Sequence, residues 1–195
     1  MKRLYRFRGE ILGVFALILW AFPYEAGRIS LSAICLALLG VVLRLEARRV
    51  IGEHSRGREK SAPELVTFGI YSKLRHPLYL SNLCFCFAFI LFHLGVSAAS
   101  GFLAFAVTLF VIALAKSEDV FLMEKFGQAF LDWKSETPMF FPNGKSGMPE
   151  TLASNEKQKF RHVLWSDRWT WFWLLFYTFL LVLRRHLDLP FALNF

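Results

Sequence analysis

The sequence predicts an all-α polytopic membrane protein with about five transmembrane helices. Hydrophobic residues make up 55% of the 195 residues, and the mean hydropathy is +0.42. Charged residues make up only 19%, fewer than the surface of a soluble domain normally requires. In addition, residues 77–115 contain no Asp, Glu, Lys or Arg. This composition excludes a disordered or fibrous chain and favours lipid as the solvent.

The first two spans are expected at residues 11–24 and 29–43, two uncharged runs near the N-terminus. Both runs are shorter than the roughly 20 residues that a span needs. Each can reach across a bilayer if flanking Arg, Trp or Tyr side chains extend to the interface. No small-residue cleavage site follows the first run, so we expect it to be an anchor and not a removed signal peptide.

The third and fourth spans are expected at residues 78–94 and 98–115, joined by a tight turn that begins at Gly95. Helices of this length return the chain to the side on which it started. We therefore expect Arg75 and His76 to face Glu118 and Asp119 on that side of the membrane.

A fifth span is expected at residues 169–183, an aromatic-rich uncharged run followed by Arg184 and Arg185. Because this pair of arginines falls on the side with few basic residues, an interfacial helix is the alternative for this segment.

The orientation follows from the distribution of Lys and Arg. Of the 23 basic residues, 20 fall before the first span, between the second and third, or between the fourth and fifth. The positive-inside rule therefore places the N-terminus and residues 44–76 and 116–168 in the cytoplasm, and we favour a prokaryotic inner membrane. Since topology explains the net charge of +8, no nucleic-acid partner is expected.

Three segments follow from this pattern. Residues 1–50 form an N-terminal transmembrane helix pair, residues 51–142 a catalytic core, and residues 143–195 a C-terminal extension with the fifth transmembrane or interfacial helix. The three cysteines lie in apolar runs, and the histidines lack ligand spacing, so neither a metal site nor a disulfide framework is expected.

Candidate site residues gather in the two cytoplasmic stretches. Arg75 and His76 stand at the start of the third span, where free backbone N–H groups favour an anion. Glu118 and Asp119 would attract a cation. The alternative is that these residues are only a charged membrane flank and that the nearby aromatic residues form an interfacial belt.

Two blocks of sequence resemble a known superfamily. The first is Leu-Val-Thr-x-Gly-x-Tyr-x-x-x-Arg-His-Pro-x-Tyr at residues 65–79, and the second is Glu-Asp-x-x-Leu-x-x-x-Phe-Gly at residues 118–127. They resemble the isoprenylcysteine carboxyl methyltransferase and phospholipid methyltransferase superfamily, integral membrane enzymes that use S-adenosylmethionine. The resemblance covers residues 56–142.

The resemblance implies a cytoplasmic S-adenosylmethionine site and assigns residues to it. The implied cofactor-binding residues are Arg56, Pro63, Glu64, Leu65, Val66, Tyr71, His76, Pro77, Leu78, Tyr79 and Glu118. The implied catalytic residues are Arg75, Lys116 and Glu118. In this interpretation Arg75 or Lys116 holds an anionic group of the substrate, and Glu118 contacts cationic or hydroxyl groups of the cofactor. If the acceptor is an amine, its proton goes to Glu118, Asp119 or Glu136.

Four positions depart from the superfamily pattern. Asp119 stands in place of a second glutamate, Trp133 in place of a tyrosine, Leu114 in place of a substrate-binding arginine, and Glu136 in place of a basic residue. The loss of two basic residues disfavours a carboxylate acceptor. We therefore expect methyl transfer to a lipid amine, with a lipidated substrate, the isoprenylcysteine carboxylate, as the second choice.

Two other functions stay open at this point. Membrane sterol reductases, which bind NADPH, resemble this chain in an Arg-His-Pro-x-Tyr block. A non-enzymatic membrane adaptor would use the same charged residues only as flanks.

Overall fold

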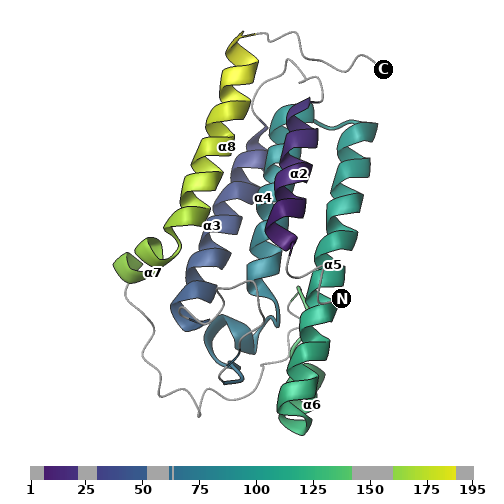
Figure 1. Cartoon of the computed structure of the whole chain (residues 1–195), viewed down its shortest axis with the longest axis vertical. Coiled ribbons are helices and arrows are strands. Elements are labelled where there is room, and N and C mark those ends of the chain that lie inside the picture. Colours follow the sequence, from purple (N-terminus) through teal and green to yellow (C-terminus); the bar gives the residue numbers. More distant parts are fainter. Residues whose placement is uncertain (1–6, 22–29, 52–61, 63, 142–159, 188–195) are drawn as a thin grey trace.

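The computed structural model describes residues 7–21, 30–51, 62, 64–141 and 160–187. Within these residues it contains seven α-helices, one short 3₁₀ helix and no strand, which confirms the all-α prediction. The elements are α2 (Arg8–Ala21), α3 (Leu31–Ile51), η2 (Gly69–Ser72), α4 (Pro77–Leu94), α5 (Ala98–Phe126), α6 (Gln128–Glu136), α7 (Phe160–Ser166) and α8 (Arg168–Leu187). The long helices lie side by side in an up-and-down bundle (Figure 1).

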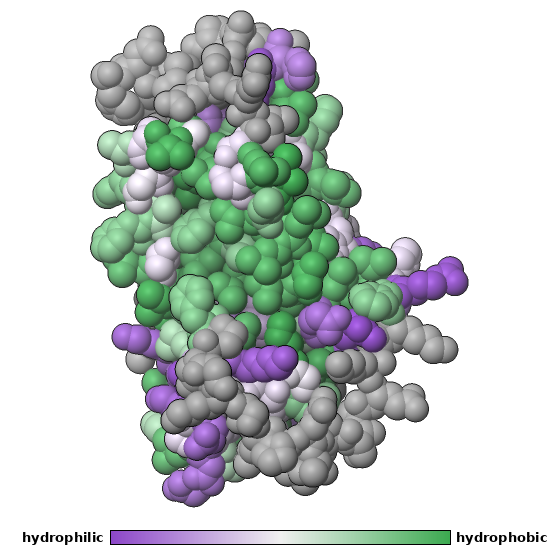
Figure 2. Space-filling view, turned by 180° about the vertical axis from the view of Figure 1, so that it is seen from behind, coloured by the Kyte–Doolittle hydropathy of each residue, from purple (hydrophilic) through white to green (hydrophobic). Residues whose placement is uncertain are grey.

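Two helices, α4 and α5, are long and apolar enough to cross a membrane. They confirm the hairpin predicted at residues 77–115. Helix α2 is apolar but has only 14 residues, and α3 carries several charged residues in its second half. The arrangement with five spans therefore stays a prediction. Figure 2 shows a broad band of hydrophobic residues across the middle of one face, with hydrophilic residues gathered toward its lower end.

The α4–α5 hairpin is defined by local signals at both helix ends. Pro77 occupies the first turn of α4, where its fixed φ is already helical. After α4 ends, Ser97 and Ser100 form a capping box that starts α5. Helix α5 continues past the predicted residue 115 to Phe126, so Glu118 and Asp119 lie on the helix and not in a loop. An apolar run marks the membrane crossing, whereas the helix itself can extend into water.

Helix α4 is the centre of the bundle. In its apolar window 56% of the residues are buried, compared with 33% in α5. Helix α3 packs closely against it at Gly40, where an added Cβ would lie 3.0 Å from Phe85 Cε1. The Ser81 hydroxyl donates a hydrogen bond to the Gly40 carbonyl at 2.7 Å. Helix α3 also runs past the predicted residue 43 to Ile51, which places two arginines on its last turns.

Helix α8 packs along the bundle and not across its end. The Tyr177 hydroxyl donates to the Ala16 carbonyl of α2 at 2.6 Å, and Arg185 donates to the Phe92 carbonyl of α4 at 3.2 Å. The Arg184 guanidinium lies 4.8 Å from the centre of the Trp20 ring and is buried. Both arginines that followed the predicted fifth span are thus bound within the protein, so their position does not argue against a helix along the bundle.

The end of the bundle away from the α4–α5 turn, here called the open end, is organised around η2. Gly69 has φ of +60°, and an added Cβ there would lie 2.7 Å from Val50 Cγ2 of α3. Only glycine satisfies both constraints. The turn buries Tyr71, whose backbone carbonyl accepts a hydrogen bond from Trp133 Nε1 of α6 at 3.1 Å. Tyr71 is thereby fixed between α3 and α6.

Candidate functional site

The start of α4 and the end of the apolar part of α5 are joined by Asp119. Its carboxylate pairs with Arg75 Nη2 at 3.2 Å and with His76 Nε2 at 2.8 Å. All three side chains are buried, with exposed fractions of 3 to 8%. We call Arg75, His76 and Asp119 the hairpin clamp. It confirms the expected approach of these two helix ends, with Asp119 as the residue that makes the contact.

The hairpin clamp also holds the segment that follows α6. Arg75 Nη1 donates to the Thr137 carbonyl at 2.6 Å and to the Lys134 carbonyl at 3.1 Å. The backbone N–H of Arg75 donates to the Pro138 carbonyl at 2.9 Å. Most of the donors of Arg75 are therefore used inside the protein, and its guanidinium acts as a brace between three segments.

The Asp119 contact orients the His76 ring. Because a carboxylate only accepts hydrogen bonds, Nε2 carries the proton, and in a neutral ring Nδ1 is left as an acceptor. The ring lies 5.6 Å from the Tyr79 ring and 6.4 Å from the Phe140 ring, centre to centre. His76 is therefore a fixed acceptor with aromatic neighbours.

Glu118 differs from its neighbour. It is half-buried, and among the described residues its carboxylate makes no hydrogen bond or ion pair. Burial raises the pKa of the Tyr71 hydroxyl, and the negative charge of Glu118 raises it further. Among the described residues, the open end thus contains a carboxylate without a hydrogen bond or ion pair, and its charge acts on the Tyr71 hydroxyl.

The other predicted site residues fall into three groups. Leu65, Val66 and Leu78 are half-buried and pack in the apolar cluster around Tyr71. Glu64 and Lys116 are exposed. Arg56 and Pro63 lie outside the described residues.

The departures from the superfamily pattern also have clear positions. Leu114 is 2% exposed and packs in the same apolar cluster as Tyr79, so no polar group replaces the missing arginine at that point. Glu136 is exposed at the end of α6. Trp133 is buried and binds the backbone of η2, a structural contact.

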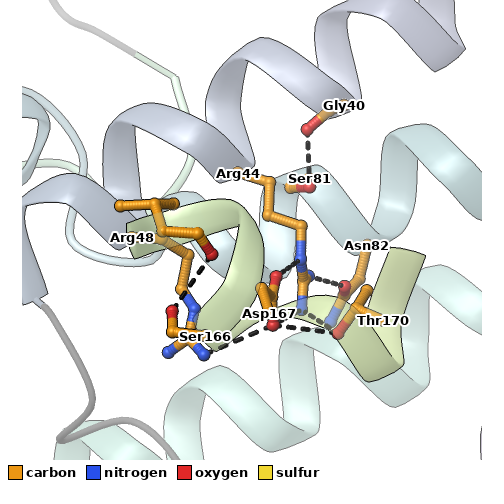
Figure 3. A network of polar contacts seen from close by, with 9 residues as sticks. Gly40, Arg44, Arg48, Ser81, Asn82, Ser166, Asp167 and Thr170 are labelled. Atoms are coloured by element: carbon orange, nitrogen blue, oxygen red, sulfur yellow. Dashed lines mark hydrogen bonds and ion pairs between the residues drawn. The ribbon is translucent and has the colours of Figure 1, made fainter. Parts of the chain in front are cut away.

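A second polar cluster near the open end was not predicted. Arg44 donates to Asp167 at 2.5 Å, to Asn82 at 3.0 Å and to Thr170 at 2.8 Å (Figure 3). Arg48 lies one turn further along α3 and pairs with the other oxygen of Asp167 at 3.3 Å. These five residues, here called the α3–α8 network, join α3 and α4 to the start of α8.

Asp167 is the only acidic residue that the network contains. Burial alone would raise the pKa of its carboxyl, but the adjacent Arg44 charge and hydrogen bond, together with the Arg48 charge, hold it below its usual value. Asp167 is therefore ionised at neutral pH. Weak signals in the sequence were the four-residue spacing of the arginines, which puts them on one helix face, and an Asp-x-x-Thr pattern at a helix start.

The described residues contain no group of three or more His, Cys, Asp or Glu side chains that could hold a metal ion. No solved structure matches the chain.

Two curated proteins are similar to this chain. It is 33% identical over 127 residues to the nickel-cobalt-cadmium resistance protein NccN of Alcaligenes xylosoxydans xylosoxydans, covering 65% of this chain and 58% of NccN. It is 35% identical over 120 residues to the cobalt-zinc-cadmium resistance protein CzcN of Cupriavidus metallidurans, covering 58% of this chain and 51% of CzcN. The chain thus spans only about half the length of these relatives.

A family model gives the broader assignment. The phospholipid methyltransferase model matches residues 29–129, which include α3, η2, the α4–α5 hairpin and the hairpin clamp. Because the match covers more than half of the chain, the chain belongs to the phospholipid methyltransferase family.

Proposed function

We propose that the protein is a membrane methyltransferase that uses S-adenosylmethionine and methylates a lipid amine at the open end of the bundle. The observation that carries the proposal is the Glu118 carboxylate, which has no partner among the described residues, acts on the Tyr71 hydroxyl through its charge and adjoins Asp119 of the hairpin clamp in sequence. A half-buried carboxylate without a partner is costly unless a ligand supplies the missing positive charge or hydrogen-bond donors.

The residues at the open end suit S-adenosylmethionine, which carries a sulfonium, an ammonium and ribose hydroxyls. Glu118 would bind one of the cationic or hydroxyl groups, and His76 Nδ1 would accept a hydrogen bond. Tyr71, Tyr79 and Phe140 provide aromatic surface beside these groups. When bound, the cofactor supplies an electrophilic methyl group.

In the reaction, the protein positions the cofactor and the acceptor, keeps water away from them and accepts a proton. The hairpin clamp fixes the ends of α4 and α5, so that groups on the two helices keep their relative positions. The apolar cluster around Tyr71 excludes water from one side. An ammonium acceptor must lose a proton before it can attack, and we assign this proton to Glu118, whose carboxylate makes no hydrogen bond or ion pair among the described residues.

A lipid amine is preferred as the acceptor because the surroundings suit a cation better than a carboxylate. Leu114 is buried among apolar side chains, and Arg75 is used as a brace. The exposed Lys116 is then the group proposed to hold a lipid phosphate. The isoprenylcysteine carboxylate remains the competing acceptor.

The open end is proposed to face the cytoplasm, where the cofactor is made. The 20 basic residues on that side of the predicted topology support this orientation. The proposal keeps five membrane segments, with α8 as the fifth.

Ligand-induced stabilisation tests the cofactor. We expect S-adenosylhomocysteine to raise the melting temperature of the purified protein in detergent, because a ligand that binds only the folded state stabilises it. Glu118→Gln should reduce this shift, whereas Glu124→Gln, at an exposed position on the same helix, should not. A shift with NADPH and none with S-adenosylhomocysteine would assign the site to a reductase.

Methyl transfer tests the acceptor. The protein is incubated with labelled S-adenosylmethionine and either phosphatidylethanolamine or a farnesylated cysteine. We expect label in the phospholipid as a base-stable N-methyl group. Label only in the farnesylated cysteine, as a base-labile ester, would replace the lipid amine by a carboxylate acceptor and leave the methyltransferase proposal intact.

A further inference from the structure

The α3–α8 network contains more positive than negative charge. Arg44 and Arg48 share one carboxylate, that of Asp167, and all three side chains are at most 12% exposed. Asn82 and Thr170 are neutral and bind only Arg44 or Asp167 within the network. Removing the Asp167 charge would leave two positive charges one helical turn apart with limited access to water.

The network lies against the proposed cofactor site. Ala47, between the two arginines on α3, packs in the same apolar cluster as Tyr71 and Leu78. The charges of Arg48 and Arg44 act on the Tyr71 hydroxyl together with that of Glu118. The arginines of α3 and Glu118 of α5 therefore act on the same hydroxyl with opposite charge.

The carboxylate that balances these arginines comes from outside the segment matched by the family model. Residues 29–129 include Arg44, Arg48, Asn82 and Glu118, whereas Asp167 stands between α7 and α8. The family segment of this chain thus brings two arginines of low exposure to the proposed cofactor site, and the turn between α7 and α8 brings the carboxylate that pairs with both.

We infer that Asp167 is a positioning residue of the cofactor site, which holds Arg44 and Arg48 and offsets their charge so that a sulfonium can bind beside them. The inference rests on the proposed use of S-adenosylmethionine. Asp167 touches neither substrate nor cofactor and acts through the two arginines.

The charge of the ligand provides a specific measurement. S-adenosylmethionine has a net charge of +1, and S-adenosylhomocysteine, which lacks the methyl group, is a neutral zwitterion. Loss of the Asp167 charge should weaken binding of the first more than binding of the second. At an effective dielectric constant near 20, two unit charges on the order of 12 Å apart interact strongly enough to change an affinity by about tenfold, so we expect a change of this order in the affinity ratio.

The experiment measures both affinities by calorimetry on the full-length protein in detergent, for the wild type, Asp167→Asn, Arg48→Gln and the double variant. Asp167→Asn should shift the ratio about tenfold toward S-adenosylhomocysteine. Arg48→Gln removes a positive charge and should shift it toward S-adenosylmethionine. The double variant restores the net charge and should return the ratio to near the wild-type value.

A purely structural role of Asp167 predicts a different result, since a distorted site would lower the affinity for both ligands by the same factor. An unchanged ratio in Asp167→Asn would therefore overturn the inference and leave the proposed function standing. If Asp167→Asn does not fold, Arg48→Gln decides, because a well-folded Arg48→Gln protein with the wild-type ratio also overturns it. A wild-type protein that binds neither ligand would refute the proposed function and, with it, this inference.

Discussion

The hairpin clamp and the α3–α8 network both contain arginine paired with aspartate, but they differ in how far apart the partners lie in the sequence. Each pairs an arginine of low exposure with an aspartate from another segment of the chain. In the hairpin clamp the partners are 44 residues apart, and one precedes the first helix of the hairpin while the other lies on the second helix. In the α3–α8 network they are 123 residues apart and meet only when α7 and the turn that follows it pack on α3. The first contact belongs to a single supersecondary unit, and the second requires the assembled bundle.

The two clusters also differ in charge. The hairpin clamp pairs one arginine and one histidine with one carboxylate, whereas the α3–α8 network pairs two arginines with one carboxylate. Loss of the aspartate should therefore lower the free energy of unfolding more in the network, where two neighbouring arginines on one helix would lose a shared carboxylate.

The largest effect is expected for Asp167→Ala, which should lower the free energy of unfolding by about 3 to 5 kcal/mol, the cost of leaving a buried charge unpaired. Thermal or denaturant unfolding in detergent measures it. In an Arg44→Ala background the same change should lower the free energy of unfolding clearly less, since one of the two cations that would lose their counter-charge is then absent. Equal costs in both backgrounds would show that the ion pair does not stabilise the fold.

A smaller loss, about 2 to 4 kcal/mol, is expected for Asp119→Ala. Arg75 keeps its two backbone carbonyl acceptors, but it loses its counter-charge and His76 loses its acceptor. The matched control is Asp132→Ala on the exposed face of α6, which should change stability by less than about 0.5 kcal/mol. If the two variants are equally stable, the hairpin clamp is not a brace.

Gly69→Ala separates backbone strain from charge. The positive φ and the short approach to Val50 should together cost about 1 to 3 kcal/mol and displace Tyr71. The comparison is Gly101→Ala in α5, where a new Cβ meets nothing within 4 Å and should be neutral or slightly stabilising. If unfolding experiments give the two variants a similar free energy of unfolding, the role assigned to the turn is wrong.

Acid should remove the contribution of Asp167 to stability. Its pKa is lowered in the folded protein, so this contribution is complete above the unfolded-state pKa of about 3.9 and is lost as the pH falls through the lower folded value. The difference in unfolding free energy between the wild type and Asp167→Asn should therefore shrink as the pH is lowered from about 5 toward 2. A difference that stays constant over this range would show that the charge of Asp167 is not what matters.

The smallest effect on stability is expected for Glu118→Gln, within about 0.5 kcal/mol, because this carboxylate has no partner among the described residues that would be stranded. Its effect on ligand binding should be larger, a loss of roughly 1 to 3 kcal/mol for S-adenosylmethionine measured by calorimetry. Glu118 and Asp119 are adjacent in sequence. If Glu118→Gln mainly weakens ligand binding and Asp119→Ala mainly lowers stability, then Glu118 serves the ligand and Asp119 serves the fold. A large loss of stability in Glu118→Gln would remove that distinction.

Several features followed from the sequence because they depend on local patterns. The uncharged residues 77–115 determined the α4–α5 hairpin, and the length of its helices brought Arg75 and His76 back to the region of Asp119. Helix class and the start of α4 at Pro77 are likewise set by neighbouring residues.

Other features were decided only by the tertiary structure. The hydrophobic runs did not show that α3 and α5 extend beyond their apolar segments, because a helix needs apolar residues only where it meets lipid or a core. The adjacent Glu118 and Asp119 look equivalent in sequence, yet helical geometry turns them in different directions, and only one meets the hairpin clamp. The pairing of Arg44 with Asp167 depends on how α7 and the turn before α8 pack against α3, and no local pattern encodes a contact between residues 123 positions apart.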